Sequence, residues 1–242
     1  MYLKTEEVLA RNKNRNYGYD ENKNIRALTD REFYDISCEM GSNQDNPQYR
    51  RLFDNFSRWI ARTLGVNTGL EIGCGPGYLL YCLNKLGIDA HGTDGNPYSH
   101  EYFKSKHPAL SHRYHLDPRL EKNYGQVDVL LSMEVFEHIE DEGLILVFRK
   151  IREQFKPKLI VFSSTPHPDL NPEWDQQWGH INIKPTAEWD DLFARNGFVA
   201  SKMTVPFTEW SRLYVNKALV SEPKYCRLLK KQSWLSRKIA ML

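Results

Sequence analysis

Two carboxylates and an imidazole lie within five consecutive residues of this chain, from Glu134 to His138. The pKa of an unperturbed histidine is close to neutral pH, so His138 could act as a general base. Glu134, Glu137 and His138 could instead bind a divalent metal such as Mg²⁺, Mn²⁺ or Zn²⁺, because residues three or four apart share one helical face and these side chains suit such ions. In a third interpretation, Glu137 and His138 cap the following helix. His180, ahead of another expected helix, offers a further imidazole.

A second group of residues could bind a ligand through its backbone. The stretch Glu71-Ile72-Gly73-Cys74-Gly75-Pro76-Gly77 lies between an apolar, strand-like segment and an expected helix. Three glycines make a turn that no β-carbon obstructs. A strand, a glycine turn and a helix N-terminus together form a nucleotide-binding platform. The dinucleotide-binding pattern Gly-x-Gly-x-x-Gly is not met, because Tyr78 occupies the position of its third glycine.

An acid follows the glycine turn at a distance that suits ribose binding. Asp94 comes 17 residues after Gly77, at the end of an expected strand. A carboxylate in this position can accept hydrogen bonds from both hydroxyls of a ribose diol. The sequence Asp94-Gly95-Asn96-Pro97 is also a strong turn signal, and the two roles are compatible.

The elements that must position these residues are indicated by apolar runs and helical periodicity. Strands are expected at 87–93, 111–116, 127–131, 158–162, 199–205 and 212–219, and helices at 30–38, 46–64, 78–86, 141–155 and 185–196. Alternating strands and helices predict an α/β fold with a doubly wound, mostly parallel sheet. Ligands of such sheets bind beyond the carboxyl ends of the strands, where both candidate groups would lie.

The pattern Glu-x-Gly-x-Gly-x-Gly at residues 71–77 resembles the first motif of class I S-adenosylmethionine-dependent methyltransferases, and the resemblance covers roughly residues 60–220. It implies a Rossmann-like, seven-stranded, mostly parallel sheet with an antiparallel last strand, and an enzyme that uses S-adenosylmethionine. The residues it implies for cofactor binding are Glu71, Gly73, Cys74, Gly75, Gly77, Asp94, Gly95, Asp117, Ser132 and Met133. Asp117 would accept the adenine amino group; a capping role is the alternative.

The Glu-x-x-Glu-His stretch with its later histidine resembles the metal site of small-RNA 2′-O-methyltransferases, and related segments occur in ubiquinone-pathway O-methyltransferases. The implied ligands are Glu134, Glu137, His138 and His180. Without a metal, His138 and Glu137 are the expected catalytic residues. We therefore expect O-methylation of a small molecule or glycan hydroxyl. The alternatives are a metal-dependent RNA 2′-O-methyltransferase and a non-catalytic S-adenosylmethionine-binding scaffold.

Composition restricts the class of protein further. The net charge of +2 argues against a chain that is basic throughout. The four cysteines form no Cys-x-x-Cys pair, and no apolar run is long enough to span a membrane. The first 20 residues are polar and lack the apolar core of a signal peptide, so we expect a cytoplasmic protein.

Three regions are expected along the chain. Residues 1–45 would form an N-terminal arm or lid, and residues 46–220 the methyltransferase domain. Residues 221–242 would form a basic amphipathic helix, with six basic residues and no acid from Lys224 onward. In the resembled family the loop after the fifth strand often forms the acceptor pocket, which here would involve His167, Trp174, Gln176, Gln177 and Trp178; an ordinary surface loop is the alternative.

Overall fold

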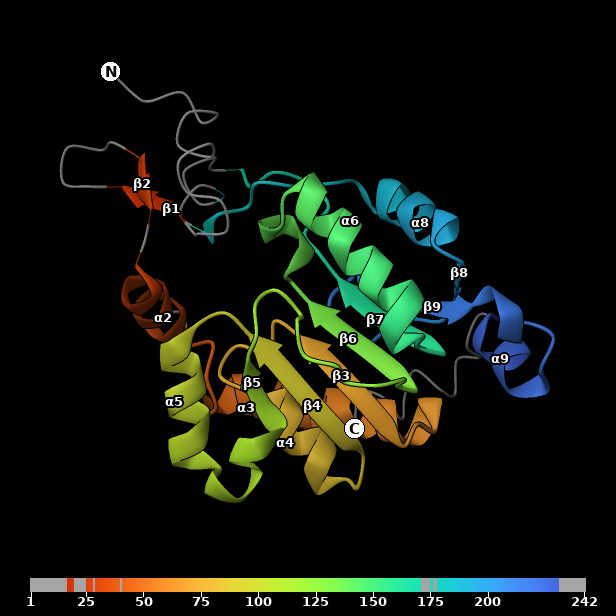
Figure 1. Cartoon of the computed structure of the whole chain (residues 1–242), viewed down its shortest axis with the longest axis horizontal. Helices are drawn as coiled ribbons and strands as arrows, with labels where there is room; N and C mark the ends of the chain where they lie inside the picture. Colours follow the sequence, from red (N-terminus) through yellow and green to blue (C-terminus); the bar gives the residue numbers. More distant parts are fainter. Residues whose placement is uncertain are drawn as a thin grey trace.

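The computed structural model describes residues 17–19, 25–27, 29–39, 41–170, 175 and 178–230. Its centre is a seven-stranded sheet in the order β5-β4-β3-β6-β7-β9-β8 (Figure 1). The strands are β3 (Thr68–Ile72), β4 (Asp89–Asp94), β5 (Tyr114–Leu116), β6 (Val129–Met133), β7 (Leu159–Ser163), β8 (Phe198–Ala200) and β9 (Arg212–Asn216). Only the last of these seven strands, β9, runs antiparallel to the others. The predicted fold class is confirmed.

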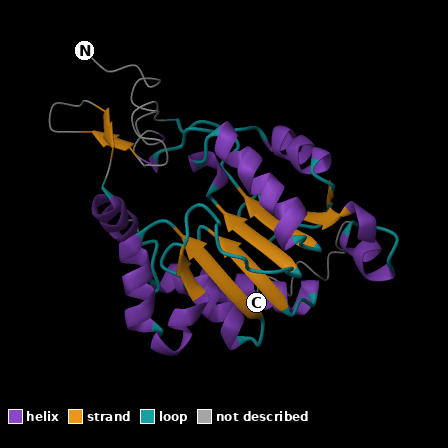
Figure 2. Cartoon of the chain, in the orientation of Figure 1, coloured by secondary structure: helices purple, strands orange, loops and turns teal. Residues whose placement is uncertain are grey.

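Helices cover both faces of the sheet, as Figure 2 shows. One face is covered by α3 (Pro47–Trp59), α4 (Tyr78–Lys85) and α5 (Pro97–Lys106), and the other by α6 (Asp141–Lys150) and α8 (Thr186–Arg195). Successive strand residues point to opposite faces. Leu131 and Val161 therefore pack with α3 and α4, whereas Leu130 and Ile160 pack with α6 and α8. Strands buried on both faces are continuously apolar for this reason.

The two long predicted helices are present with identifiable ends. The Asn46 side chain accepts a hydrogen bond from the Gln48 N–H (2.9 Å) and so caps α3. The helix ends in a π-helical turn, η1 (Ile60–Leu64), followed by Gly65 in the left-handed conformation (φ +57°). On the other face α6 likewise continues into a π-helical turn, η4 (Ile151–Phe155).

Three predicted strands are shorter than expected. A 3₁₀ helix, η2 (Pro108–Arg113), occupies the first half of the predicted strand 111–116, leaving only β5. β8 ends at Ala200, well before residue 205. β9 ends at Asn216, whose side chain accepts from the Ala218 N–H (3.0 Å) and begins the 3₁₀ turn η5 (Lys217–Leu219). At β9 the Asn216 cap therefore ended a strand that apolar composition alone would have continued.

The chain ends contribute small elements. Strands β1 (Tyr17–Tyr19) and β2 (Ile25–Ala27) pair antiparallel, and the predicted helix 30–38 is α2 (Asp30–Glu39). Helix α9 (Pro223–Leu228) begins the predicted C-terminal helix. Residues 1–16 of the expected arm and 231–242 of the expected helix lie outside the described residues. In the part of the chain that the structure describes, we find no helix with the length and apolarity needed to cross a bilayer.

Candidate active site

The glycine turn after β3 requires its glycines at two positions. Gly73 and Gly77 adopt φ values of +71° and +79°, which favour glycine. A β-carbon at Gly73 would overlap the Val135 side chain, and one at Gly77 would overlap the ring of Phe103. Gly75 differs, because no heavy atom lies within 4 Å of the position its β-carbon would take. The middle of the turn therefore faces open space, where a ligand can approach the backbone.

Asp94 and Tyr114 hold the peptide groups of this turn. The Gly75 N–H donates to Asp94 Oδ2 (2.8 Å), and the Gly75 carbonyl accepts from the Tyr114 hydroxyl (2.8 Å). The Asn96 N–H donates to Asp94 Oδ1 (2.8 Å). Burial raises the pKa of Asp94 despite these backbone donors. The predicted ribose-binding acid therefore also fixes the glycine turn.

Two further predicted cofactor residues are buried beneath the turn. The Glu71 side chain is 5% exposed, and its Oε2 has no hydrogen-bond partner. Burial, followed by the nearby Asp94 carboxylate, raises the pKa of Glu71 well above its usual value. Cys74 is also buried, and burial raises the pKa of its thiol, so it is not poised as a nucleophile.

Asp117 binds the backbone of the loop that follows it. Its Oδ1 accepts from the Glu121 N–H (2.9 Å), and its Oδ2 accepts from the Lys122 N–H (3.0 Å) and the Tyr124 hydroxyl (2.8 Å). Burial would raise the pKa of Asp117, but these donors lower it below its usual value. The next element after this loop is β6 and not a helix, so Asp117 holds a loop and caps no helix, while the predicted adenine contact stays a prediction.

The remaining predicted cofactor residues stand near the same edge of the sheet. Ser132 and Met133 end β6, and Ser132 pairs with Ile72 just before the glycine turn. The Ser132 hydroxyl is buried without a partner. Gly95 is exposed in the turn after Asp94. Their roles in cofactor binding stay predictions.

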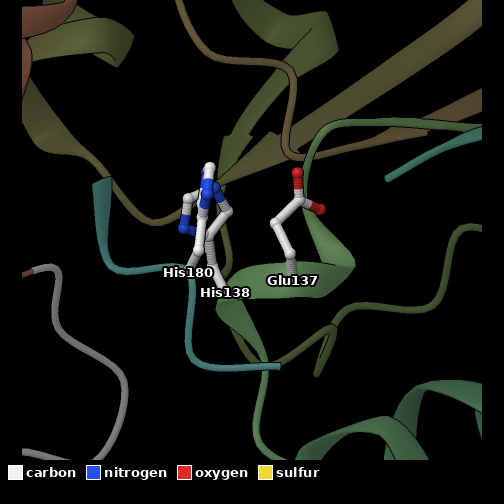
Figure 3. Close-up of side chains that lie close together, drawn as sticks. All are labelled: Glu137, His138 and His180. Carbon is white, nitrogen blue, oxygen red and sulfur yellow. The ribbon is translucent and has the colours of Figure 1, made fainter. Parts of the chain in front are cut away.

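Three of the four predicted metal ligands come together beyond β6. One potential ligand atom from each of Glu137, His138 and His180 lies within 4.8 Å of the other two. Figure 3 shows the three side chains close together. Glu137 and His138 belong to a 3₁₀ turn, η3 (Phe136–His138), whereas His180 comes from the segment between β7 and α8. The Glu137 carbonyl accepts the N–H groups of both Ile181 and Asn182 (2.9 Å each) and ties the two segments together.

In this cluster, side-chain atoms that can accept hydrogen bonds lie near one another. Glu137 is fully buried, and neither of its carboxylate oxygens has a hydrogen-bond partner. Burial raises the pKa of Glu137 well above its usual value, and the neighbouring Glu134 adds to this effect. Burial, followed by the charge of His180, lowers the pKa of His138 to about 4. His138 is therefore neutral at pH 7.

The hydrogen bonds of both imidazoles identify their tautomers. His138 Nδ1 lies 3.2 Å from the Gly179 carbonyl, and His180 Nδ1 lies 2.8 Å from Asp175 Oδ1. A carbonyl or carboxylate oxygen only accepts, so in both rings Nδ1 carries the proton. On each ring Nδ1 is used in that bond, and Nε2 is the nitrogen whose lone pair can bind another group. A buried carboxylate and two such lone pairs suit a cation or a proton donor.

Glu134, the fourth predicted ligand, is not part of this cluster. Its Oε1 accepts from Trp210 Nε1 (2.9 Å) and from the Ser163 hydroxyl. Its backbone is left-handed (φ +55°), which is uncommon for a residue other than glycine. Glu134 therefore turns toward β7 and the loop before β9, while Glu137 and His138 turn toward His180.

Sequence reasoning missed several residues around the site. Trp210 binds Glu134 and lies 6.2 Å from the ring of His167, while Asp175 binds His180. No fixed spacing in the sequence signals either contact, because both join segments through loops. Tyr114 was placed in a strand, but nothing in its neighbours indicated the hydrogen bond to the glycine turn.

Helix α2 touches both sides of the site. Asn96 Nδ2 donates to the Asp30 carbonyl (2.9 Å) next to the predicted ribose-binding residue. The Phe33 ring meets the Trp178 ring edge to face at 5.9 Å, beside Gly179 and His180. Helix α2, which is part of the predicted lid, thus has contacts beside the predicted ribose-binding acid and beside His180. Its function as a lid stays a prediction. Of the other predicted pocket residues, His167 faces Trp210, and Trp174, Gln176 and Gln177 lie outside the described residues.

Comparison with known proteins identifies the family. A family model of a methyltransferase domain matches residues 43–202. The ubiquinone biosynthesis O-methyltransferase of Bradyrhizobium diazoefficiens is 32% identical over 119 residues, which cover 46% of this chain and 43% of that protein. The match therefore spans less than half the length of this relative.

Solved structures share the fold at low sequence identity. DesVI of Streptomyces venezuelae has a TM-score of 0.56 and 14% identity, over 78% of this chain and 98% of that one. A magnesium protoporphyrin IX methyltransferase of Synechocystis, solved with bound SAH, has a TM-score of 0.52 and 16% identity, over 69% of this chain and 83% of that one. With the family match, the glycine turn and the sheet order, the chain belongs to the class I S-adenosylmethionine-dependent methyltransferases.

Proposed function

We propose that this methyltransferase transfers the methyl group of S-adenosylmethionine to a hydroxyl oxygen of a small molecule. The observation that carries this proposal is the group of acceptors formed by Glu137, His138 and His180 beyond β6. Such a group can hold a hydroxyl and manage its proton, which is what methylation of oxygen requires. The relative named as a ubiquinone biosynthesis O-methyltransferase supports the same acceptor class.

We further propose that the three residues hold a divalent cation. The fit rests on their chemistry, namely a buried carboxylate without hydrogen-bond partners and two imidazoles whose Nδ1 atoms bond to Gly179 and Asp175, which leaves Nε2 of each ring as the ligand atom. One carboxylate and two imidazoles suit Mn²⁺, Fe²⁺ or Zn²⁺ better than Mg²⁺, which prefers oxygen. When bound, such a cation would supply Lewis acidity that lowers the pKa of an acceptor hydroxyl.

The chain's own residues have defined parts in this proposal. Glu137 would hold the cation in its ionised form, with its proton released to solvent. His138 and His180 would hold the cation through Nε2, because Nδ1 of each ring donates to Gly179 or Asp175. Without a cation, His138 Nε2 would accept the proton of the hydroxyl directly. Its pKa of about 4 makes it a weak base, which favours the role of a ligand.

The described part of the C-terminal region gives less support to an RNA substrate. Lys224 Nζ donates to the Gly65 carbonyl (2.8 Å), and Tyr225 and Leu228 are buried in the core. The beginning of the predicted basic helix is therefore used to pack on its own domain. RNA and glycan acceptors, the scaffold alternative, the cytoplasmic location and the boundaries 1–45, 46–220 and 221–242 stay predictions.

The test measures metal content and acceptor preference in one preparation. Protein purified without chelator is analysed by mass spectrometry for Mn, Fe and Zn, beside a Glu137→Ala, His138→Ala variant. Methyl transfer is then measured with catechols and with their monomethyl ethers. We expect stoichiometric metal that the variant loses, and methylation of the catechols only.

Other results would redirect the proposal. Methylation of catechols by metal-free protein would keep the O-methyltransferase and remove the cation. Binding of S-adenosylmethionine without methylation of any hydroxyl would favour the scaffold alternative. Transfer to RNA 3′ ends, but not to catechols, would replace the small-molecule acceptor.

A further inference from the structure

Of the three residues in the cluster, His180 is the one that regular secondary structure does not hold in place. Glu137 and His138 lie in η3 directly after β6, and Phe136 anchors that turn in the core. His180 comes from the irregular stretch between β7 and α8. A ring in such a segment needs a specific partner to fix its rotation. The structure supplies that partner in Asp175, a residue that has no role in the site described above except this contact.

Asp175 receives three hydrogen bonds from its own loop. Its Oδ1 accepts from His180 Nδ1 (2.8 Å), its Oδ2 accepts from the Asp169 N–H (2.7 Å), and its carbonyl accepts from the His180 N–H (2.8 Å). The residue is 8% exposed. Burial of a carboxylate is unfavourable unless it is hydrogen-bonded, and here both oxygens are used.

We propose that Asp175 is the positioning residue that makes His180 a ligand. This proposal rests on the proposed cation at Glu137, His138 and His180. The Asp175 carboxylate holds the Nδ1 proton of His180, so the Nε2 lone pair faces away from Asp175 and stays free for the cluster. Metal-binding histidines commonly donate their other N–H to a carboxylate, which fixes the tautomer and the ring and makes the imidazole more basic.

The two carboxylate oxygens of Asp175 have different partners, so its role in positioning His180 can be tested separately from a purely structural role. Oδ2 binds the backbone of the loop, whereas Oδ1 binds the imidazole. In Asp175→Asn the amide oxygen can still accept from the Asp169 N–H, while the amide nitrogen donates to His180 Nδ1. That exchange moves the His180 proton to Nε2 and removes the lone pair from the cluster.

The experiment compares full-length wild type with Asp175→Asn and Asp175→Glu. The tautomer of His180 is read by ¹⁵N NMR in the metal-free protein, and cation affinity is measured with Mn²⁺ by calorimetry and with Co²⁺ by visible absorption. Asp190→Asn is the matched control. Asp190 lies on α8, its Oδ1 accepts from the Tyr214 hydroxyl (2.8 Å), and it plays no part in the cluster. S-adenosylmethionine affinity verifies that every variant is folded.

We expect Asp175→Asn to shift the His180 proton to Nε2 and to weaken Mn²⁺ binding by about 10- to 100-fold. Asp175→Glu, which keeps a carboxylate, should keep the Nδ1–H tautomer and bind more tightly than Asp175→Asn. Asp190→Asn should bind Mn²⁺ as wild type does. Cofactor affinity should be unchanged in all three variants.

Two results would overturn the inference, and they are distinguishable. If wild type binds Mn²⁺ and both Asp175 variants bind it equally well, Asp175 is only a loop anchor and the proposed cation site stands. If wild type binds S-adenosylmethionine but neither Mn²⁺ nor Co²⁺, the cation itself is excluded and the role of Asp175 falls with it.

Discussion

The cofactor side and the acceptor side of this site are built in different ways. Around Gly75, where we predict that the cofactor binds, the exposed groups are backbone atoms, held by Asp94 and Tyr114 from neighbouring strands. Beyond β6 they are side chains, and one of them comes from an irregular segment. The first side depends on chain geometry, and the second depends on residue identity. Enzymes that share one cofactor but act on different acceptors would require such a division between backbone contacts and side-chain contacts.

The sharpest test of the cofactor side is Gly75→Arg. Because no atom lies within 4 Å of a β-carbon at Gly75, the arginine would extend into the space where the ligand binds. We expect the affinity for S-adenosylmethionine to fall at least about 100-fold, or about 2.7 kcal/mol, in calorimetry.

Gly87→Arg is its control. Gly87 also has a positive φ (+82°) and open space, but it lies in the turn after α4 at the other end of the strands. Both variants place a side chain at a positive φ, +49° at Gly75 and +82° at Gly87, so equal loss of cofactor affinity in the two would show that backbone strain, and not the site, is responsible.

On the acceptor side Glu137→Gln should separate chemistry from cofactor binding. The amide keeps the shape of the side chain but cannot ionise. We expect the rate of methyl transfer to fall about 10²-fold, since several kcal/mol of stabilisation of the reacting hydroxyl is lost. Glu140→Gln, three residues away at the start of α6, should leave the rate unchanged. Weaker cofactor binding in Glu137→Gln would contradict the division between the two sides.

Acid should destabilise both sides through buried histidines. Burial, followed by nearby positive charge, lowers the pKa of His138 and that of His115 on β5 to about 4 each. Between pH 6.5 and about 4 the unfolded chain binds a proton at each histidine that the folded chain does not. Stability therefore falls with pH in this range, by about 1.4 kcal/mol per pH unit per histidine.

Denaturant unfolding at several pH values checks this dependence. His115→Gln and His138→Gln should each flatten the slope between pH 6.5 and 4 by about one proton. A slope in His115→Gln that equals that of wild type would mean that His115 is protonated in the folded protein.

The smallest expected effect concerns α2, which touches both sides. Phe33→Ala removes the edge-to-face contact with Trp178, worth about 0.5–1.5 kcal/mol. We expect KM for the acceptor to rise about two- to tenfold, with little change in kcat. Tyr34→Phe, which keeps the ring packed near Tyr98 and Tyr102, is the control. If KM is the same in Phe33→Ala and wild type, α2 has no part in closing the acceptor site.

The same division explains what could be predicted from the sequence. The glycine turn and Asp94 are a local pattern with a fixed spacing, so these residues could be predicted without a structure, whereas the hydrogen bond from the Gly75 N–H to Asp94 could not. Glu137 and His138 were accessible because they follow a recognisable buried strand. The hydrogen bond between Glu134 and Trp210 could not be predicted from the sequence. It depends on a left-handed backbone at Glu134 and on a loop residue 76 positions away. Asp175 was missed because a lone acid in a loop has no periodicity.

The carbonyl of Glu137 has a consequence for how this enzyme could diversify. It accepts two N–H groups from Ile181 and Asn182, and these bonds are made by the backbone whatever side chains the loop carries. Both ends of the stretch 164–180 are thus fixed, by β7 at the start and by the Glu137 carbonyl at the finish. Insertions or exchanges within that stretch that keep the contacts of Asp169 and Asp175 with each other and with His180 would leave the imidazole of His180 near its place. Evolution, or a protein engineer, can therefore vary the loop to admit new acceptors while the reactive centre stays intact.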